Sequence, residues 1–282
     1  MYEVIRILGL IAQILFLVYF SILQLSFAYS GLIAVQYLRR MLRQGGKQTL
    51  EYQLRHNFVI PISILVPAYN EEATIVTSLH SFLSLHYPDF EIVAINDGSS
   101  DKTIDIIIEE FDLIPTTHYG RSFTKTAKVV EVYRSLRYPN LTVIDKENGG
   151  KADALNVGLA YARKSIFTAV DADSLLDADA LLRVTRRFKE DDDMVAIGGT
   201  IRVLNNATLE AGKVTALANP KKWIERFQVI EYIRAFYIGR ASLSHFNMQL
   251  IISGAFGIFK RDPVIEVGGY RSDTVGEDME LV

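Results

Sequence analysis

The stretch Phe167 to Leu176, FTAVDADSLL, decides how this sequence is interpreted. An apolar run, Ile166 to Val170, stops abruptly at Asp171, as expected for a short buried strand that ends in a turn. Open α/β sheets bind their ligands beyond the carboxyl ends of such strands. The pattern therefore places Asp171 and Asp173 where a ligand would lie.

The two aspartates suggest a metal site. In an extended backbone, side chains two residues apart point the same way, so Asp171 and Asp173 are expected to share one partner. Two carboxylates ~4 Å apart repel each other by roughly 4 kcal/mol at an effective dielectric constant of 20. A divalent cation removes that repulsion, and hard oxygen ligands suit Mg²⁺ or Mn²⁺. The alternative is that these acids cap a helix beginning near Asp177, and the aspartates alone do not decide between the two.

Length and composition limit the class of protein. The chain has 282 residues and a formal net charge of -3, which fits one domain of roughly 220 to 240 residues plus a membrane anchor. It carries neither a basic nucleic-acid-binding patch nor an acidic tail. The lack of cysteine excludes disulfides, thiolate metal sites and a cysteine nucleophile. The histidines show no H-E-x-x-H spacing, which argues against a zinc site.

The N-terminal region predicts a transmembrane helix. Residues 7–38 contain no charged side chain, and a helix of that length, ~48 Å, exceeds the ~30 Å hydrocarbon core. Arg39, Arg40 and Arg43 follow at once, so the positive-inside rule predicts a plasma (inner) membrane protein with its catalytic domain on the cytoplasmic side. A core helix of a soluble protein and a signal peptide are the weaker alternatives. The predicted domains are 1–43 (helix and basic flank), 44–57 (linker) and 58–282 (catalytic domain).

The rest of the chain alternates strands and helices. Such alternation predicts an α/β fold with a mostly parallel sheet and helices on both faces. The predicted strands are 62–66, 90–95, 141–144 and 166–170, and the predicted helices are 70–85, 102–111, 152–163, 179–189 and one from 261 to the glycines at 268 and 269.

Four segments are harder to interpret. Residues 112–140 suggest one short helix or strand, and 194–204 one or two strands. Residues 250–253 suggest a last strand, with a strand or turn at 254–259. Residues 221–246 carry apolar side chains at helical spacing, which favours a core helix over a helix on a membrane surface.

Four loops are predicted at the carboxyl edge of the sheet, and each brings a carboxylate or a cation: 67–71, 96–101, 148–153 and 171–174. Each alone suits an ordinary turn or helix cap. The P-loop, the Rossmann G-x-G-x-x-G and the G-x-S-x-G elbow are all absent. What remains are aspartates for a metal and a lysine for phosphate, which suit a bound nucleoside diphosphate.

One further acidic pair stands near the end of the sequence. Gly276-Glu277-Asp278 places carboxylates just before a predicted helix. Such a group could accept the proton of an attacking hydroxyl, or could be a capping acid.

Taken together, these motifs resemble glycosyltransferase family 2, and within it the membrane-embedded processive group that includes cellulose, hyaluronan and poly-N-acetylglucosamine synthases. The resemblance runs from Ile62 to the last residue. The matching segments, in the family's order, are Pro67-Ala68-Tyr69-Asn70-Glu71-Glu72, Asn96-Asp97-Gly98-Ser99-Ser100-Asp101, Asn148-Gly149-Gly150-Lys151-Ala152-Asp153-Ala154-Leu155-Asn156, Asp171-Ala172-Asp173-Ser174, Ser253-Gly254-Ala255-Phe256 and Gly276-Glu277-Asp278.

The resemblance implies a GT-A fold and an inverting, metal-dependent transfer of a hexose or N-acetylhexosamine from a UDP-sugar to a polysaccharide or lipid-linked acceptor. It implies Mn²⁺ or Mg²⁺ as the cofactor and allows a partner subunit in the membrane. The implied nucleotide contacts are Pro67, Ala68, Tyr69, Glu71, Asp97, Lys151 and Asp171. The implied metal ligands are Asp173 and Asp171, the acceptor contacts Ser253 and Gly254, and the catalytic residues Asp278, as general base, and Glu277.

Two departures from the family pattern qualify these expectations. Asn96 stands where an aspartate is common, and Gly276 where a threonine is common. The sequence also stops before the Gln-x-x-Arg-Trp motif and the later membrane helices, so we expect a truncated chain. The alternatives are an inactive sugar-nucleotide-binding or scaffold module and, with weaker support, a sugar nucleotidyltransferase.

Overall fold

A computed structural model describes residues 2–43, 55, 59–117, 120–204, 208–210, 213–216, 220–246, 248, 252–253, 255–273, 276 and 281. The chain forms two compact units. One comprises Met1–Gly45 and Lys222–Gln249, and the other Gly46–Lys221 and Leu250–Val282. The segment from Lys222 to Gln249 therefore groups with the N-terminal helix, whereas the sequence assigned it to the catalytic domain. Most of the predicted linker, 44–57, lies outside the described residues.

The first unit is helical. Its longest element is helix α1, Tyr2–Arg43. Among the helices in the described ranges, α1 alone is long and apolar enough to cross a membrane. Helix α7 (Trp223–Ile233), the π-helix η2 (Arg234–Arg240) and helix α8 (Ala241–His245) follow one another without a break. Both η2 and α8 contact α1, where Ala34 is buried. The core-helix interpretation of 221–246 is wrong for α7, because none of its residues is buried.

The second unit is built on an eight-stranded sheet with the order β3-β4-β5-β2-β1-β6-β10-β7. The strands are β1 (Ile62–Ala68), β2 (Phe90–Asp97), β3 (Leu113–Pro115), β4 (Val129–Ser135), β5 (Leu141–Lys146), β6 (Ile166–Ala169), β7 (Ala196–Gly198) and β10 (Gly257–Lys260). Strands β8 (Thr208–Glu210) and β9 (Lys213–Ala216) form a separate pair.

The centre of the sheet is parallel, as predicted. Strands β5, β2, β1 and β6 lie side by side in parallel pairs, and Leu65 of β1 is in register with both Val93 and Ala169. The outer strands β3, β4, β10 and β7 join through antiparallel pairs. The four motif-bearing loops after the parallel strands therefore share one edge.

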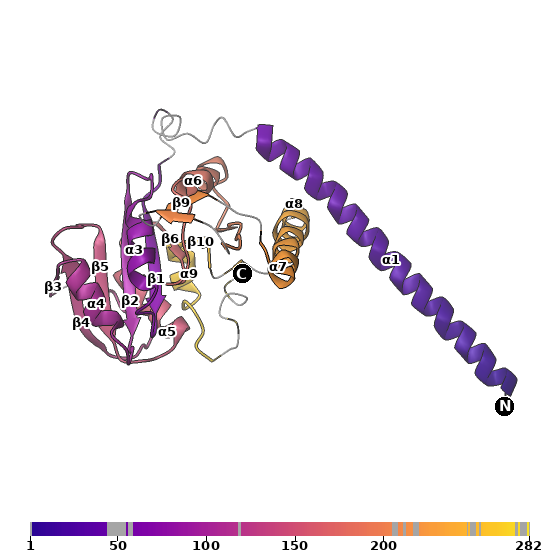
Figure 1. The fold of residues 1–282 in the computed structure, drawn as a ribbon, viewed down its shortest axis with the longest axis horizontal. Helices are drawn as coiled ribbons and strands as arrows, with labels where there is room; N and C mark the ends of the chain where they lie inside the picture. Colours follow the sequence, from indigo (N-terminus) through magenta and orange to yellow (C-terminus); the bar gives the residue numbers. More distant parts are fainter. Residues whose placement is uncertain are drawn as a thin grey trace. The chain divides into compact units, whose positions relative to one another are not determined.

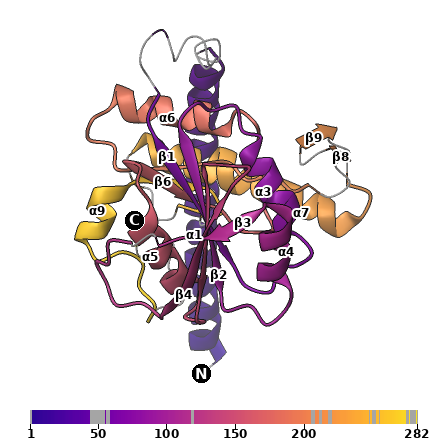
Figure 2. The same cartoon turned by 90° about the vertical axis from the view of Figure 1, so that its left-hand side faces the viewer.

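Two apolar clusters cover the two faces of the sheet. Because side chains alternate along a strand, Ile64 and Val66 face one cluster and Leu65 faces the other. Helices α3 (Ile75–Leu83), α4 (Thr103–Glu110) and α6 (Ala180–Glu190) contribute to the first cluster. Helices α5 (Lys151–Tyr161) and α9 (Arg261–Glu266) contribute to the second. Figures 1 and 2 show α3 and α4 on one side of the strands and α5 on the other.

Most predicted elements are confirmed within a few residues, and three regions differ. Residues 112–140 hold two strands, β3 and β4, rather than one short element. The first helix begins at Ile75 rather than at Asn70, because residues 72–74 form a turn. Of the strand predicted at 250–253, the described residues Ile252 and Ser253 are not in a strand. The last strand, β10, overlaps the strand or turn predicted at 254–259.

Candidate functional site

The loop after β1 is bound to the loop after β2. Asn70 has a φ of 56°, a left-handed conformation that asparagine tolerates better than most residues. Its side-chain oxygen accepts the N–H of Ser100 at 2.8 Å, and its own N–H donates to the Ser99 hydroxyl at 2.9 Å. These bonds hold the first two predicted site loops against each other.

Acidic side chains reinforce this junction. The N–H of Glu71 donates to the Thr103 hydroxyl at 2.8 Å, and the Glu71 carboxylate accepts the Thr74 hydroxyl at 2.6 Å. The N–H of Glu72 donates to Asp101 at 3.2 Å. Desolvation raises the pKa of Asp101, but hydrogen bonds from the hydroxyl and N–H of Thr103 and from the N–H of Glu72 outweigh it, so this pKa lies below its ordinary value. Asp101 therefore stays ionised and keeps these bonds at neutral pH.

The first motif leaves one aromatic side chain exposed beside this junction. Pro67 and Ala68 are the last two residues of β1, opposite Ile95 and Asn96 of β2. Tyr69 follows and is 52% exposed. Its ring is therefore accessible at the edge where the sequence predicts nucleotide binding.

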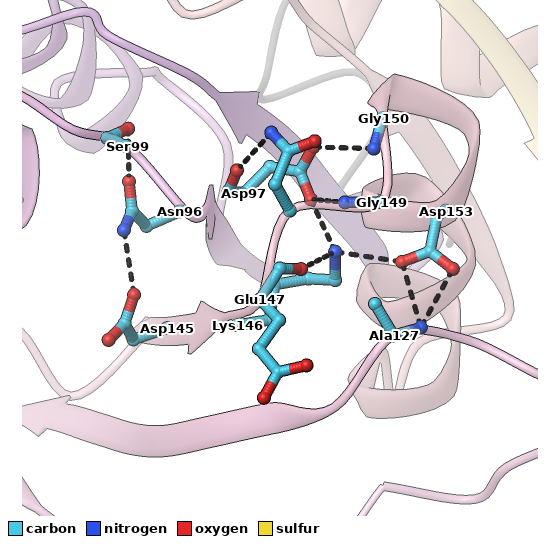
Figure 3. A network of polar contacts seen from close by, with 11 residues as sticks. Asn96, Asp97, Ser99, Ala127, Asp145, Lys146, Glu147, Gly149, Gly150 and Asp153 are labelled. Carbon is cyan, nitrogen blue, oxygen red and sulfur yellow. Dashed lines mark hydrogen bonds and ion pairs between the residues drawn. The ribbon is translucent and has the colours of Figure 1, made fainter.

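The loop after β2 is bound in turn to the loop after β5 (Figure 3). Asp97 accepts the N–H groups of Gly149 at 3.0 Å and Gly150 at 2.8 Å, and its carbonyl accepts the side-chain amide of Asn148 at 2.8 Å. Gly98 has a φ of +66°, and a Cβ there would lie 2.6 Å from the backbone nitrogen of Asn148. Glycine is therefore required at Gly98 for both its conformation and the close approach of the two loops.

A salt bridge joins the loops after β5 and β6. Lys151 is the first residue of α5, and its Nζ lies 2.7 Å from Oδ1 of Asp171. Both side chains are about one-third exposed, 37% and 35% respectively. The lysine predicted to bind phosphate and the first predicted metal ligand are thus brought together. The pair is accessible to a ligand.

The predicted relation between Asp171 and Asp173 needs correction. An extended backbone was expected here, but β6 ends at Ala169 and the chain turns, with the N–H of Ser174 donating to the carbonyl of Asp171 at 3.0 Å. Ala172 points into the core within this turn. The strand periodicity therefore does not apply to the two carboxylates, and a shared partner cannot be inferred from it.

The chemistry of the two aspartates still fits a divalent cation. Asp171 is partly exposed, Asp173 is exposed, and both offer hard oxygen ligands. In the described part of the chain no group of three or more acidic, histidine or cysteine side chains could hold a metal. Mg²⁺ is commonly bound by one or two carboxylates together with substrate phosphates, and two aspartates meet that requirement.

The predicted acceptor and catalytic residues are only partly described. Ser253 is partly exposed, and its carbonyl accepts the N–H of Phe256 at 3.1 Å. Gly254, Glu277 and Asp278 lie outside the described residues. Gly276, with a φ of 115°, is described. The predicted roles of these residues remain predictions.

Sequence reasoning missed Lys146. This residue is almost completely buried at the end of β5, where its Nζ contacts Asp97 and lies 2.8 Å from Asp153 (Figure 3). A signal was present in the sequence, because strand alternation places Lys146 on the same face as Ile144, which is buried against α5. A lysine at such a position calls for a buried anionic partner.

Comparisons with known proteins agree with this architecture. A family model described as glycosyltransferase like family 2 matches residues 60–282. The poly-beta-1,6-N-acetyl-D-glucosamine synthase of Staphylococcus epidermidis is 32% identical over 226 residues, covering 80% of this chain and 46% of the relative. The synthase of the same name from Staphylococcus aureus strain COL is 30% identical over 221 residues, covering 78% and 44%. The chain thus spans about half the length of these curated relatives.

A solved structure supports the fold. The mannosyltransferase PcManGT from Pyrobaculum calidifontis, in complex with GDP-Man and Mn²⁺, aligns with a TM-score of 0.53 at 20% identity, covering 89% of this chain and 62% of that protein. The predicted α/β GT-A fold is confirmed. With the family model covering most of its length, the chain belongs to glycosyltransferase family 2.

Proposed function

We propose that this chain is the catalytic part of a membrane-anchored, inverting glycosyltransferase. It moves a hexose or N-acetylhexosamine from a UDP-sugar to a growing polysaccharide or glycolipid acceptor. The observation that carries the proposal is the Lys151–Asp171 pair, at 2.7 Å, on the edge where the loops of four parallel strands meet. A cation beside a carboxylate at such an edge suits a diphosphate and the metal that accompanies it.

The reaction follows from this donor and acceptor chemistry. The acceptor hydroxyl attacks the anomeric carbon of the sugar, a new C–O bond forms there, and the bond from that carbon to the diphosphate oxygen breaks. Asp278 takes the hydroxyl proton, and UDP leaves with the bonding electrons. Asp171 and Asp173 would hold Mn²⁺ or Mg²⁺, which would supply charge neutralisation for the leaving diphosphate. Ser253 and Gly254 contact the acceptor, whose polymeric nature is suggested by the synthases this chain resembles.

The test of the donor site is a calorimetric titration of UDP into the full chain in detergent, with and without Mn²⁺. We expect binding that requires the cation and is lost in Asp173→Ala. Asp177→Ala is the matched control, because Asp177 is an exposed acid four residues further on that pairs with Arg183. Absence of UDP binding by the folded chain would refute the proposal. Binding without turnover of any UDP-sugar would favour an inactive binding module.

The membrane part of the proposal rests on the first unit. Helix α1 contains an 18-residue window with a mean hydropathy of 2.2, and no residue of that window is buried. The segment Trp223–His245, which contacts α1 within the same unit, exposes Trp223 by 73%, Phe227 by 62% and Ile230 by 61%. Transferring one such side chain out of water is worth about 1.5–3 kcal/mol.

The guanidinium of Arg226 lies 5.4 Å from the Trp223 ring, and tryptophan beside basic residues is typical of membrane interfaces. We infer that this segment lies on the cytoplasmic membrane surface.

Trp223 provides a direct test, because it is the only tryptophan in the sequence. In the full chain reconstituted into vesicles, we expect its fluorescence to be quenched by brominated phospholipids and protected from aqueous iodide. Vesicles with unbrominated lipid are the control. Emission quenched by iodide but not by brominated lipid would show that the segment faces water.

A further inference from the structure

The end of β5 buries a charge that the proposed reaction does not use. The Lys146 side chain has no exposed surface, and its Nζ contacts Asp97 Oδ1, Asp153 Oδ1 at 2.8 Å and the Glu147 carbonyl at 2.7 Å. The carboxylates of Asp97 and Asp153 are themselves only 5% and 12% exposed. A buried ammonium group is stable only when such partners surround it. Lys146 is therefore fixed in place.

Asp97 connects the buried Lys146 to the loop that contains Gly149 and Gly150. One carboxylate oxygen contacts Lys146 and accepts the N–H of Gly149, and the other accepts the N–H of Gly150 (Figure 3). Gly150 has a φ of +88°, so only a few residue types could follow this path. The ammonium group of Lys146 thus neutralises the charge of the Asp97 carboxylate, which binds the N–H groups of Gly149 and Gly150.

Asp153 holds the other side of Lys146. It lies in the first turn of α5 and also accepts the N–H of Ala127 at 3.0 Å. The network therefore joins β2, β5, the first turn of α5 and the segment before β4. Lys151 follows Gly150 directly and begins α5, so the position of its side chain depends on both anchored ends.

We propose that Lys146, held by Asp153, is a positioning residue for the donor site. Through Asp97 it sets the Gly149–Gly150 backbone and so places Lys151 opposite Asp171. This inference rests on the proposed function for its effect on the donor, but not for its effect on the loop. The Lys146 side chain has no exposed surface, so it acts through its buried partners Asp97 and Asp153.

The decisive variant is Lys146→Met, which keeps the length of the side chain and removes its charge. We expect kcat/KM for the UDP-sugar to fall by up to about 10²-fold, the scale of loss that a misplacement of about 1 Å can cause in catalysis, and UDP affinity to fall with it. The donor KM should rise while the acceptor KM is unchanged. Lys146→Arg, which restores the charge, should recover part of the loss. Amide hydrogen exchange in residues 147–151 should be faster in Lys146→Met.

Glu91→Gln is the matched control. Glu91 is also a buried carboxylate in a salt bridge, with Arg163 at 2.7 Å, but it lies near the start of β2, at the opposite edge of the sheet. We expect it to lower the thermal stability while leaving UDP affinity and exchange in 147–151 unchanged. If Glu91→Gln loses as much UDP affinity as Lys146→Met, the effect of Lys146 is one of general stability, and the inference is overturned.

A milder variant keeps the inference testable if Lys146→Met does not fold. Asp153→Asn preserves the shape of the side chain and weakens the second anchor of Lys146. Wild-type UDP affinity and wild-type exchange in this variant, or in folded Lys146→Met, would overturn the inference. Faster exchange in 147–151 in a chain whose wild type binds no UDP would instead support the loop mechanism and refute the proposed function.

Discussion

The Lys151→Met variant is expected to bind UDP about 10- to 100-fold more weakly than the unchanged chain. A hydrogen bond to a charged group contributes roughly 1.5–3 kcal/mol, and 1.4 kcal/mol is about tenfold in affinity. Lys151 is partly exposed beside Asp171 at the carboxyl edge of the sheet. Removing its charge leaves the diphosphate facing two aspartates without the cationic side chain. The measurement is a calorimetric titration of UDP in the presence of Mn²⁺.

Lys164→Met is the control for this experiment. Lys164 forms a salt bridge of similar length, 2.6 Å, with Asp89, and both residues lie at the opposite, amino-terminal edge of the sheet. Exposed ion pairs contribute little to stability, so both variants should unfold at nearly the wild-type temperature. Lys164→Met should bind UDP normally. If Lys151→Met also binds UDP normally, the assignment of the diphosphate to this edge is wrong.

The centre of the fold could be predicted because its strands are short apolar runs bounded by turn residues. Strands β1, β2, β5 and β6 are buried on both faces, and their register brings four motif loops to one edge. The antiparallel neighbours were harder to predict. Strand β10 pairs with β6 although a long segment of chain separates them, and no local pattern in the sequence records that pairing.

The site was predicted as a set of loops, but the contacts inside it were not. Strand periodicity does not apply to Asp171 and Asp173, because β6 ends at Ala169 and the N–H of Ser174 donates to the carbonyl of Asp171 in a turn. Asp97 was expected to contact the nucleotide, and its carboxylate here takes up two loop amides and a lysine. A nucleotide contact of Asp97 remains a prediction. These differences arise because hydrogen-bond partners depend on side-chain directions that a motif does not specify.

The 221–246 segment shows that sequence periodicity predicts a helix but not what its apolar face contacts. Its helical spacing of apolar residues predicted a helix correctly, and α7, η2 and α8 form one. Periodicity identifies an apolar face but not what covers it, since a protein core and a lipid surface produce the same pattern. The exposure of Trp223 and Phe227 argues against the core alternative for α7.

Asp278→Asn is expected to lower kcat about 10²- to 10⁴-fold, the usual range for loss of a general acid or base. Asparagine has nearly the same shape but cannot take the proton of an acceptor hydroxyl. UDP affinity should stay at the wild-type value, because a base that acts on the acceptor is not needed to hold the nucleotide. Release of UDP from UDP-sugar by the membrane-reconstituted protein measures kcat, and titration with UDP measures affinity.

Asp273→Asn supplies the matched control for that variant. Asp273 lies five residues before Asp278, is exposed and pairs with Arg271 at 2.8 Å. Its hydrogen bonds with that side chain hold the pKa of Asp273 below its ordinary value, so the substitution removes a full negative charge from the same stretch. An electrostatic role for the stretch as a whole predicts that both variants lose activity, whereas a single base predicts that only Asp278→Asn does. If Asp278→Asn retains turnover, Asp278 is not the general base and another carboxylate takes the proton. Glu277 would then be the next residue to substitute.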